Sequence, residues 1–284
     1  LYDKNKKRKV TTIEAMTSVY TPKEKYMNYN INIKSGDEVN LKDISNKLIE
    51  CGYERVEVVE GKGEFSFRGG ILDVFPPIAI YPYRIELFGD EVDSIRTFNI
   101  ESQRSIEKVE VVEIFPAKEV IVDEESKKRA NECIIDELNN VIEKSSNKNS
   151  EQIQKLSRIV NKNVEMLNEI YTFETIDSYL PFFYERVESF FDYFKGYTFI
   201  IDDLKRCEGK LESIYYEFNE NYLAFLQRGD ILPSQNKLLI NKEELLVNLE
   251  KSDVITLNPF EKHSGILYSE KTVEFKQITS NSYN

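Results

Sequence analysis

Two stretches in which apolar and polar residues alternate constrain the fold of this chain more than any other feature. They read Gly63-Glu-Phe-Ser-Phe-Arg-Gly-Gly-Ile-Leu-Asp-Val-Phe-Pro-Pro77 and Tyr83-Arg-Ile-Glu-Leu-Phe-Gly-Asp-Glu-Val-Asp-Ser-Ile-Arg96. A period of two is typical of half-buried β-strands, because successive side chains point to opposite faces of a sheet. Gly69 and Gly70 add a tight turn or a bulge. The sequence therefore predicts strands with one apolar and one polar face in this region.

The alternation also assigns individual side chains to a face. The inward set is Phe65, Phe67, Tyr83, Ile85 and Leu87, and the outward set is Ser66, Arg68, Arg84, Glu86 and Phe88. An outward aromatic residue between arginines has the composition of a protein-binding hot spot. A single exposed phenylalanine and solvated arginines are also common on ordinary surfaces, so periodicity alone favours the ordinary reading.

The surrounding sequence predicts a compact α+β unit over residues 29–118. A short amphipathic helix is expected from Leu41 to Cys51, with Asn40 and Asp43 placed like a capping box and Gly52 as its stop. Strands are expected near residues 55–60, 64–68, 71–75, 83–88, 91–98 and 109–115. Residues 1–28 look like the tail of another domain.

The remaining residues, 119–284, change to a helix-rich α/β pattern. Apolar residues at helical spacing over residues 123–180 predict two long helices, joined near residues 145–150. An aromatic cluster around Pro181 is interleaved with acidic residues, which favours a helix packed into a core over a base-stacking platform. A short strand at residues 197–203, a long helix to about Arg228 and short elements to residue 278 complete this part.

Composition argues against several kinds of function. The formal net charge of −12 disfavours direct binding to DNA or RNA, and the only dense basic run lies between Lys4 and Lys9. Three scattered cysteines, Cys51, Cys133 and Cys207, read as reduced cytosolic thiols, and the one histidine, His263, is expected in a loop. No secretory signal or membrane span is expected, so a cytoplasmic location is predicted. The chain begins with Leu1 and looks like an excerpt.

One segment carries a weak sign of an enzyme. Ile200-Ile-Asp-Asp203 resembles a Walker B strand, whose terminal acid holds magnesium in ATPases. A nucleotide site also needs the Gly-x-x-x-x-Gly-Lys-Ser/Thr loop, and neither Gly61-Lys-Gly63 nor Gly209-Lys210 has that spacing. We therefore predict no catalytic residue, no metal site and no cofactor for this chain.

Four motifs together resemble one known family. They are Gly52-Tyr-Glu-Arg-Val56, the run from Gly63 to Pro77, the run from Arg84 to Arg96, and Ser102-Gln-Arg-Ser105. In this order they are similar to the N-terminal region of the bacterial transcription-repair coupling factors, the Mfd family, which is itself similar to part of the excision-repair protein UvrB. The resemblance implies a truncated first helicase-like subdomain in residues 1–28, a UvrB-like domain in residues 29–118, and a degenerate helicase-like α/β subdomain in residues 119–284.

The same resemblance implies a function for the polar strand face. In this family the UvrB-like domain recruits the damage sensor UvrA, and the contacting positions fall on Arg68, Arg84 and Phe88, with Glu86 and Arg96 as weaker candidates. The family's full-length proteins are ATP- and magnesium-dependent DNA translocases that displace stalled RNA polymerase. Their C-terminal domain masks the UvrA-binding surface at rest.

Two other assignments stay open at this point. A fragment of UvrB shares the Arg-Gly-Gly turn and the Arg-Ile-Glu motif, although the approach through Thr12 to Pro22 lacks a tyrosine-rich hairpin. A free-standing nuclease or ATPase domain is the third possibility. The missing phosphate-binding loop and the acidic charge argue against it.

Overall fold

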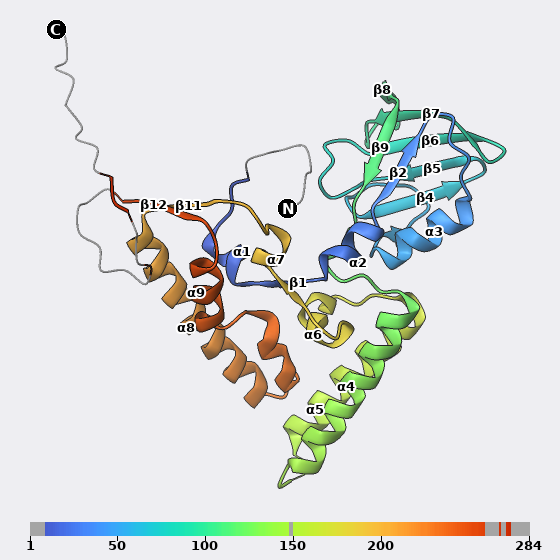
Figure 1. The fold of residues 1–284 in the computed structure, drawn as a ribbon. Helices are drawn as coiled ribbons and strands as arrows, with labels where there is room; N and C mark the ends of the chain where they lie inside the picture. Colours follow the sequence, from blue (N-terminus) through green and yellow to red (C-terminus); the bar gives the residue numbers. More distant parts are fainter. Residues whose placement is uncertain (1–8, 148–149, 259–266, 268–270, 274–284) are drawn as a thin grey trace. The chain divides into compact units, whose positions relative to one another are not determined.

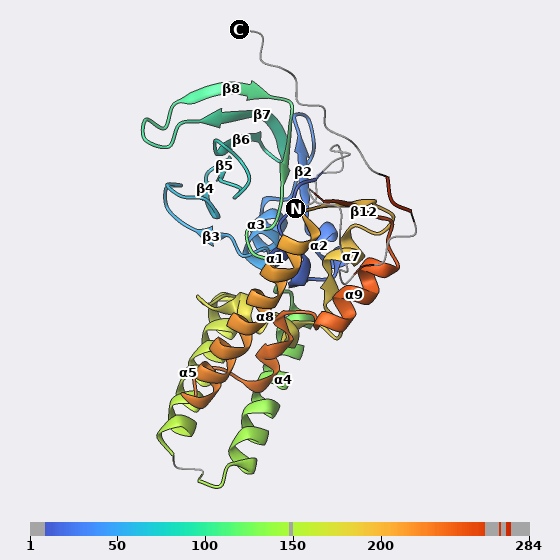
Figure 2. The same ribbon diagram turned by 90° about the vertical axis from the view of Figure 1, so that its left-hand side faces the viewer.

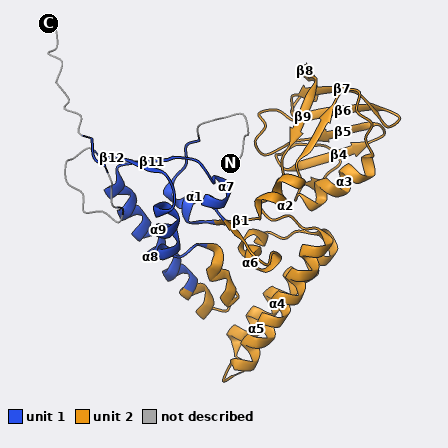
Figure 3. Cartoon of the chain, viewed as in Figure 1, with its two compact units in different colours: residues 1–18, 189–222, 239–284 blue, residues 19–188, 223–238 orange. Residues whose placement is uncertain are grey.

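The computed structural model describes residues 9–147, 150–258, 267 and 271–273. His263 and most of the basic run from Lys4 to Lys9 lie outside these residues, as do most of residues 259–278. The chain divides into two compact units (Figure 3). Unit 1 comprises residues 1–18, 189–222 and 239–284, and unit 2 comprises residues 19–188 and 223–238.

Unit 2 contains a six-stranded sheet (Figure 1). Its order is β3-β4-β5-β6-β7-β8, antiparallel except for the β3-β4 pair. The strands are β3 (Glu54–Arg55), β4 (Glu64–Arg68), β5 (Ile71–Val74), β6 (Tyr83–Phe88), β7 (Glu91–Phe98) and β8 (Ser105–Val109). Two further strands, β2 (Ile31–Lys34) and β9 (Val111–Ile114), form a separate antiparallel pair. These elements confirm the predicted α+β class.

One face of the six-stranded sheet packs into a hydrophobic core. The core holds the inward residues Phe65, Leu72, Ile85 and Ile95, together with Leu48 of α3 (Leu41–Glu50). The helix begins where predicted, because the Asn40 side chain accepts hydrogen bonds from the amides of Lys42 and Asp43. It ends at the predicted glycine, since Gly52 has a φ of 81° and donates its amide hydrogen to the carbonyl of Ile49.

Two of the strand predictions are wrong in their extent. The strand expected at residues 55–60 is only Glu54–Arg55, because the chain then leaves the sheet edge and buries Val59 with Phe75 and Phe98 in a small cluster. The strand expected at residues 109–115 is β9, which is shorter than expected, and the strand β8 before it was not predicted; the two belong to different sheets. The predictions for residues 64–68, 83–88 and 91–98 are confirmed.

Most of the other elements of unit 2 are helices. The two long helices predicted after residue 123 are present as α4 (Glu124–Lys144) and α5 (Glu151–Ile170), which lie side by side in both views (Figures 1 and 2). They bury Ala130, Ile134 and Leu138 on α4 and Leu156, Val160 and Leu167 on α5. The other elements are β1 (Val19–Tyr20), α2 (Lys23–Asn28), the 3₁₀ helix η1 (Ile176–Tyr179), α6 (Leu180–Phe183) and the 3₁₀ helix η2 (Pro233–Leu238).

The aromatic cluster is buried as predicted, but it is not one helix. Phe182 and Phe183 end α6, and the chain is then extended at Tyr184, whose hydroxyl is hydrogen-bonded to both the amide and the carbonyl of Ile121. After β10 (Glu188–Ser189), a second short helix, α7 (Phe190–Tyr193), begins at Ser189 with a capping box. The hydrogen bonds of Tyr184 and the Ser189 cap explain why the helix is interrupted.

Unit 1 contains a small parallel β-pair. The predicted strand is β11 (Phe199–Asp202), and its partner is β12 (Val254–Leu257). The helices are α1 (Ile13–Thr17), α7, α8 (Leu204–Gln227) and α9 (Lys242–Glu250), although the last turn of α8 belongs to unit 2. The expected strand followed by a long helix is confirmed, and the parallel β-pair fits the predicted α/β character.

Candidate protein-binding surface

The sheet register brings the predicted binding residues onto one face. Arg68 pairs with Ile71, and Ile71 pairs with Glu86; in the next row Asp73 pairs with Arg84. Residues directly opposite each other on neighbouring strands project to the same side of a sheet. Phe88 follows on β6 at the same alternation. We call the side of the sheet opposite the core, with Arg68, Asp73, Arg84, Glu86, Phe88 and Arg96 on it, the polar face.

Only one end of the polar face is open. Phe88 is 85% exposed and the Arg68 side chain is 56% exposed, whereas Ser66 is buried. Residues 56–61 cross over the other end, where the Ser66 hydroxyl donates to the carbonyl of Glu57 at 2.7 Å. Ser66 therefore lies on the predicted face without being accessible from outside.

Arg84 is also less accessible than its position in the alternation suggests. Its side chain is 17% exposed, and its guanidinium donates from Nε and Nη2 to the two carboxylate oxygens of Asp73 at 2.7 and 2.8 Å. Gln103 accepts two more hydrogen bonds from it, and its Cζ lies 4.5 Å from the centre of the Phe98 ring. The hydrogen bonds to Asp73 raise the pKa of Arg84. Replacement of Arg84 is therefore expected to lower the stability of the domain, because its charge is paired inside the domain.

Glu86 and Arg96 form a second polar pair on the face. Arg96 Nη2 lies 3.6 Å from Glu86 Oε2, which also accepts a hydrogen bond of 3.0 Å from the Ser94 hydroxyl. Their side chains are 32% and 41% exposed, so both can be reached from outside. A contact of 3.6 Å between partly exposed groups is weak and leaves both able to exchange partners.

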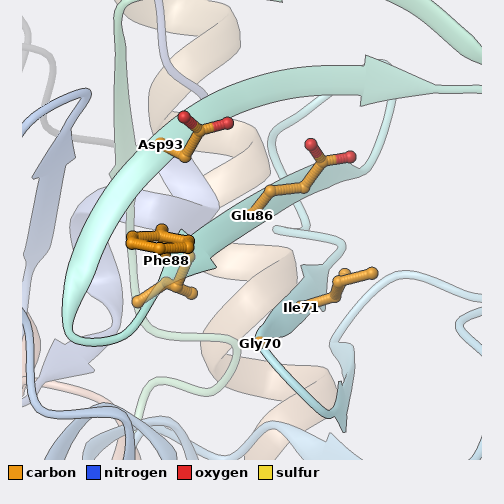
Figure 4. Close-up of a pocket in the computed structure, with 6 residues that line it drawn as sticks. Gly70, Ile71, Glu86, Phe88 and Asp93 are labelled. Atoms are coloured by element: carbon orange, nitrogen blue, oxygen red, sulfur yellow. The ribbon is translucent and has the colours of Figure 1, made fainter.

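An open pocket of about 400 Å³ lies at the exposed end of the polar face. Its lining residues are Gly70, Ile71, Glu86, Leu87, Phe88 and Asp93. Figure 4 shows Glu86 and Phe88 on β6, with Ile71 and Asp93 contributed by the strands on either side. The pocket combines apolar side chains with two carboxylates. That combination suits a protein segment with an apolar contact and a positive charge better than an anionic ligand.

Sequence reasoning missed Ile71 and Asp93. Ile71 is 38% exposed and is paired with both Arg68 and Glu86, so it belongs to the same patch. Asp93 lies at a β-bulge, where the pairing shifts from Ser94 opposite Glu86 to Val92 opposite Leu87. The spacing of the apolar residues was a sign of this bulge. Val92 and Ile95 are both buried but lie three residues apart, whereas residues on the same face of a regular strand lie two or four apart.

Comparisons with known proteins point to one family. The family model described as the UvrB interaction domain matches residues 31–120. The transcription-repair-coupling factor of Bacillus subtilis (strain 168) is 37% identical over 224 residues, which are 78% of this chain and 19% of the relative. The protein of the same name from Staphylococcus aureus (strain MRSA252) is 29% identical over 240 residues, which are 84% of this chain and 20% of the relative.

The chain belongs to the transcription-repair-coupling factor family. It spans about a fifth of the length of the curated relatives it matches. Within this coupling-factor chain, the whole polar face and its pocket fall inside the matched residues 31–120. The names of these relatives favour the coupling factor over the UvrB alternative.

No group of three or more His, Cys, Asp or Glu side chains able to hold a metal occurs in the described part of this coupling-factor chain. At the Walker-B-like strand, Asp203 accepts a hydrogen bond from the amide of Arg206 and donates its own amide hydrogen to Leu257. Asp203 thus caps α8 and ties it to β12. Among the same described residues, no helix has both the length and the apolar character that crossing a membrane requires.

Gly70 lies immediately before β5, where the backbone comes close to that of β6. Its carbonyl accepts the Leu87 amide at 2.7 Å, and a Cβ at position 70 would lie 2.8 Å from the Leu87 carbonyl oxygen. We expect Gly70→Ala to lower the free energy of unfolding by about 1–3 kcal/mol, because the strands must separate. Urea denaturation measures this. Gly69→Asn is the matched control, since Gly69 has a φ of 61°, which asparagine tolerates, and open space around it. Equal losses in the two variants would contradict the steric argument.

Proposed function

We propose that this chain is a protein-binding module that recruits UvrA through the open end of its polar face. The observation that carries the proposal is the exposure of Phe88, which is 85% accessible at the rim of a pocket and next to partly exposed ionic groups. A large aromatic side chain in that position gains the most from being covered by a partner. The match to the UvrB interaction domain and the family's coupling role support UvrA as that partner.

The proposal assigns different roles to the predicted residues. Arg68 and Phe88 contact the partner directly, because they are the two most exposed of the five predicted side chains. Glu86 and Arg96 contribute at the rim through their partly exposed ion pair. Arg84 supports the surface from below, since its guanidinium is already bound within the domain.

The longer relatives suggest the setting in which this module works. We propose that residues 29–118 form the UvrA-binding domain, that residues 1–28 and 119–284 belong to non-catalytic helicase-like subdomains, and that this chain hydrolyses no ATP. We propose that ATP-driven translocation on DNA, contact with RNA polymerase and masking by a C-terminal domain, which the family resemblance implies, belong to other parts of the full-length protein. ATP turnover by the purified 284-residue chain would contradict the non-catalytic role.

Calorimetric titration of the 284-residue chain with UvrA tests the recruitment proposal. We expect the parent chain to bind and Arg68→Ala to weaken binding by about 10-fold, as for an arginine at an interface. Arg104→Ala is the matched control, because Arg104 is an exposed arginine of the same domain outside the polar face, and it should bind like the parent. Absence of binding by the folded parent chain would overturn the proposal.

A further inference from the structure

Asp73 lies at the centre of the polar face and is bound to two arginines. Its side chain is 2% exposed. One carboxylate oxygen accepts from Arg84 Nε at 2.7 Å, and the other accepts from Arg84 Nη2 at 2.8 Å and lies 3.7 Å from Arg68 Nη2. Burying a carboxylate costs free energy unless the charge is paired, so Asp73 attracts both arginines towards it.

Arg84 has little capacity left for a partner. Of its five N–H hydrogens, two are donated to Asp73 and two to the carbonyl and side-chain oxygens of Gln103. Gln103 itself has a φ of 56°, which is a left-handed backbone conformation that is unfavourable for a residue with a Cβ. Its amide and side chain are fixed by hydrogen bonds to Asn99 and Ile100. Arg84 is therefore held from two sides and neutralises the charge of Asp73.

Arg68 is in the opposite situation. Its distance of 3.7 Å from Asp73 is too long for a hydrogen bond but short enough for ionic attraction, and more than half of its side chain remains exposed. Water screens this attraction less than it screens the Glu86–Arg96 pair, because the Asp73 carboxylate is buried and that of Glu86 is not. Arg84 makes both short hydrogen bonds to Asp73, so the N–H groups of Arg68 stay available to a partner. The three groups form a row of positive, negative and positive charges whose exposed end is Arg68.

We propose that Asp73 is a positioning residue for partner binding, which holds the exposed guanidinium of Arg68 in place before the partner arrives. The inference rests on the proposed function. A long flexible side chain that is already restrained loses less conformational freedom on binding, so the free surface is preorganised. Asp73 itself does not touch the partner, because its carboxylate is buried beneath the two arginines.

The first test needs no partner. NMR relaxation of the arginine Nε–H groups in the 284-residue chain measures how restrained each side chain is. We expect the Arg68 Nε–H order parameter to exceed that of the exposed Arg104, and to fall to the Arg104 level in Asp73→Asn. Equal mobility of Arg68 and Arg104 in the parent chain would overturn the proposal even if Asp73→Asn does not fold.

The second test is a double-mutant cycle of Asp73→Asn and Arg68→Ala, read as affinity for UvrA. If Asp73 acts through Arg68, Asp73→Asn alone weakens binding about 5–10-fold, and it has almost no further effect in the Arg68→Ala background. The same loss in both backgrounds indicates a general structural role and overturns the proposal. If the parent chain does not bind UvrA, the proposed function fails, while the relaxation measurement still decides whether Asp73 restrains Arg68.

Discussion

Phe88→Asp should weaken UvrA binding about 100-fold, which corresponds to about 2.7 kcal/mol, and leave the stability of the domain unchanged. The ring is 85% exposed, so its removal takes nothing from the core. In a complex the same ring would be covered, so an aspartate in its place would lose that apolar contact and carry a charge out of water. Titration calorimetry measures the affinity and thermal unfolding measures the stability.

The matched control for this variant is Ile106→Asp. Ile106 is a 48% exposed apolar residue on β8 of the same sheet, and its replacement adds the same charge outside the pocket. It should change UvrA affinity by less than about twofold, because non-specific effects of one surface charge are small. If both variants lose binding equally, overall charge and not the pocket controls recruitment.

Arg84→Ala should lower the free energy of unfolding by about 3 kcal/mol. The substitution leaves the Asp73 carboxylate, 2% exposed, without its two short hydrogen bonds, and it removes the side chain that covers the Phe98 ring. Arg68 compensates little, since it is 3.7 Å from the same carboxylate and half exposed. Urea denaturation of both proteins at neutral pH measures the loss.

Arg96→Ala separates this effect from the general cost of removing an arginine. Arg96 pairs with Arg84 across the sheet, but its ion pair with Glu86 is 3.6 Å long and its side chain is 41% exposed. Its removal should cost less than about 1 kcal/mol. Equal stability of the Arg84→Ala and parent chains would show that Asp73 finds another partner. Any loss of UvrA binding by Arg84→Ala must therefore be corrected for unfolding before a contact is assigned.

The long and regular patterns were predicted well. Strands β4, β6 and β7 and helices α4 and α5 were read from the sequence, because each carries several apolar residues at the period of its element. Several shorter strands were missed. β2 and β8 were not predicted, and the strand expected at residues 55–60 is only Glu54–Arg55, because Val59 is buried against Phe75 and Phe98.

The candidate site was predicted in outline only. The family resemblance singled out Arg68, Arg84 and Phe88 as a set, and their common face followed from their spacing on two strands. Nothing in the spacing distinguished the exposed Arg68 from the largely buried Arg84. That difference arises from Asp73, Gln103 and Phe98, which contact the Arg84 guanidinium in the folded domain.

The sequence by itself determined which face of each strand a side chain joins, because the alternation of a strand is a local property of the backbone. It also determined the family, through ordered motifs that need no structure to be compared. The tertiary structure decided which residues on that face remain accessible. Asp73 became the partner of both arginines only when β4, β5 and β6 paired in one register, which the turns between these strands and the burial of their opposite face fix together.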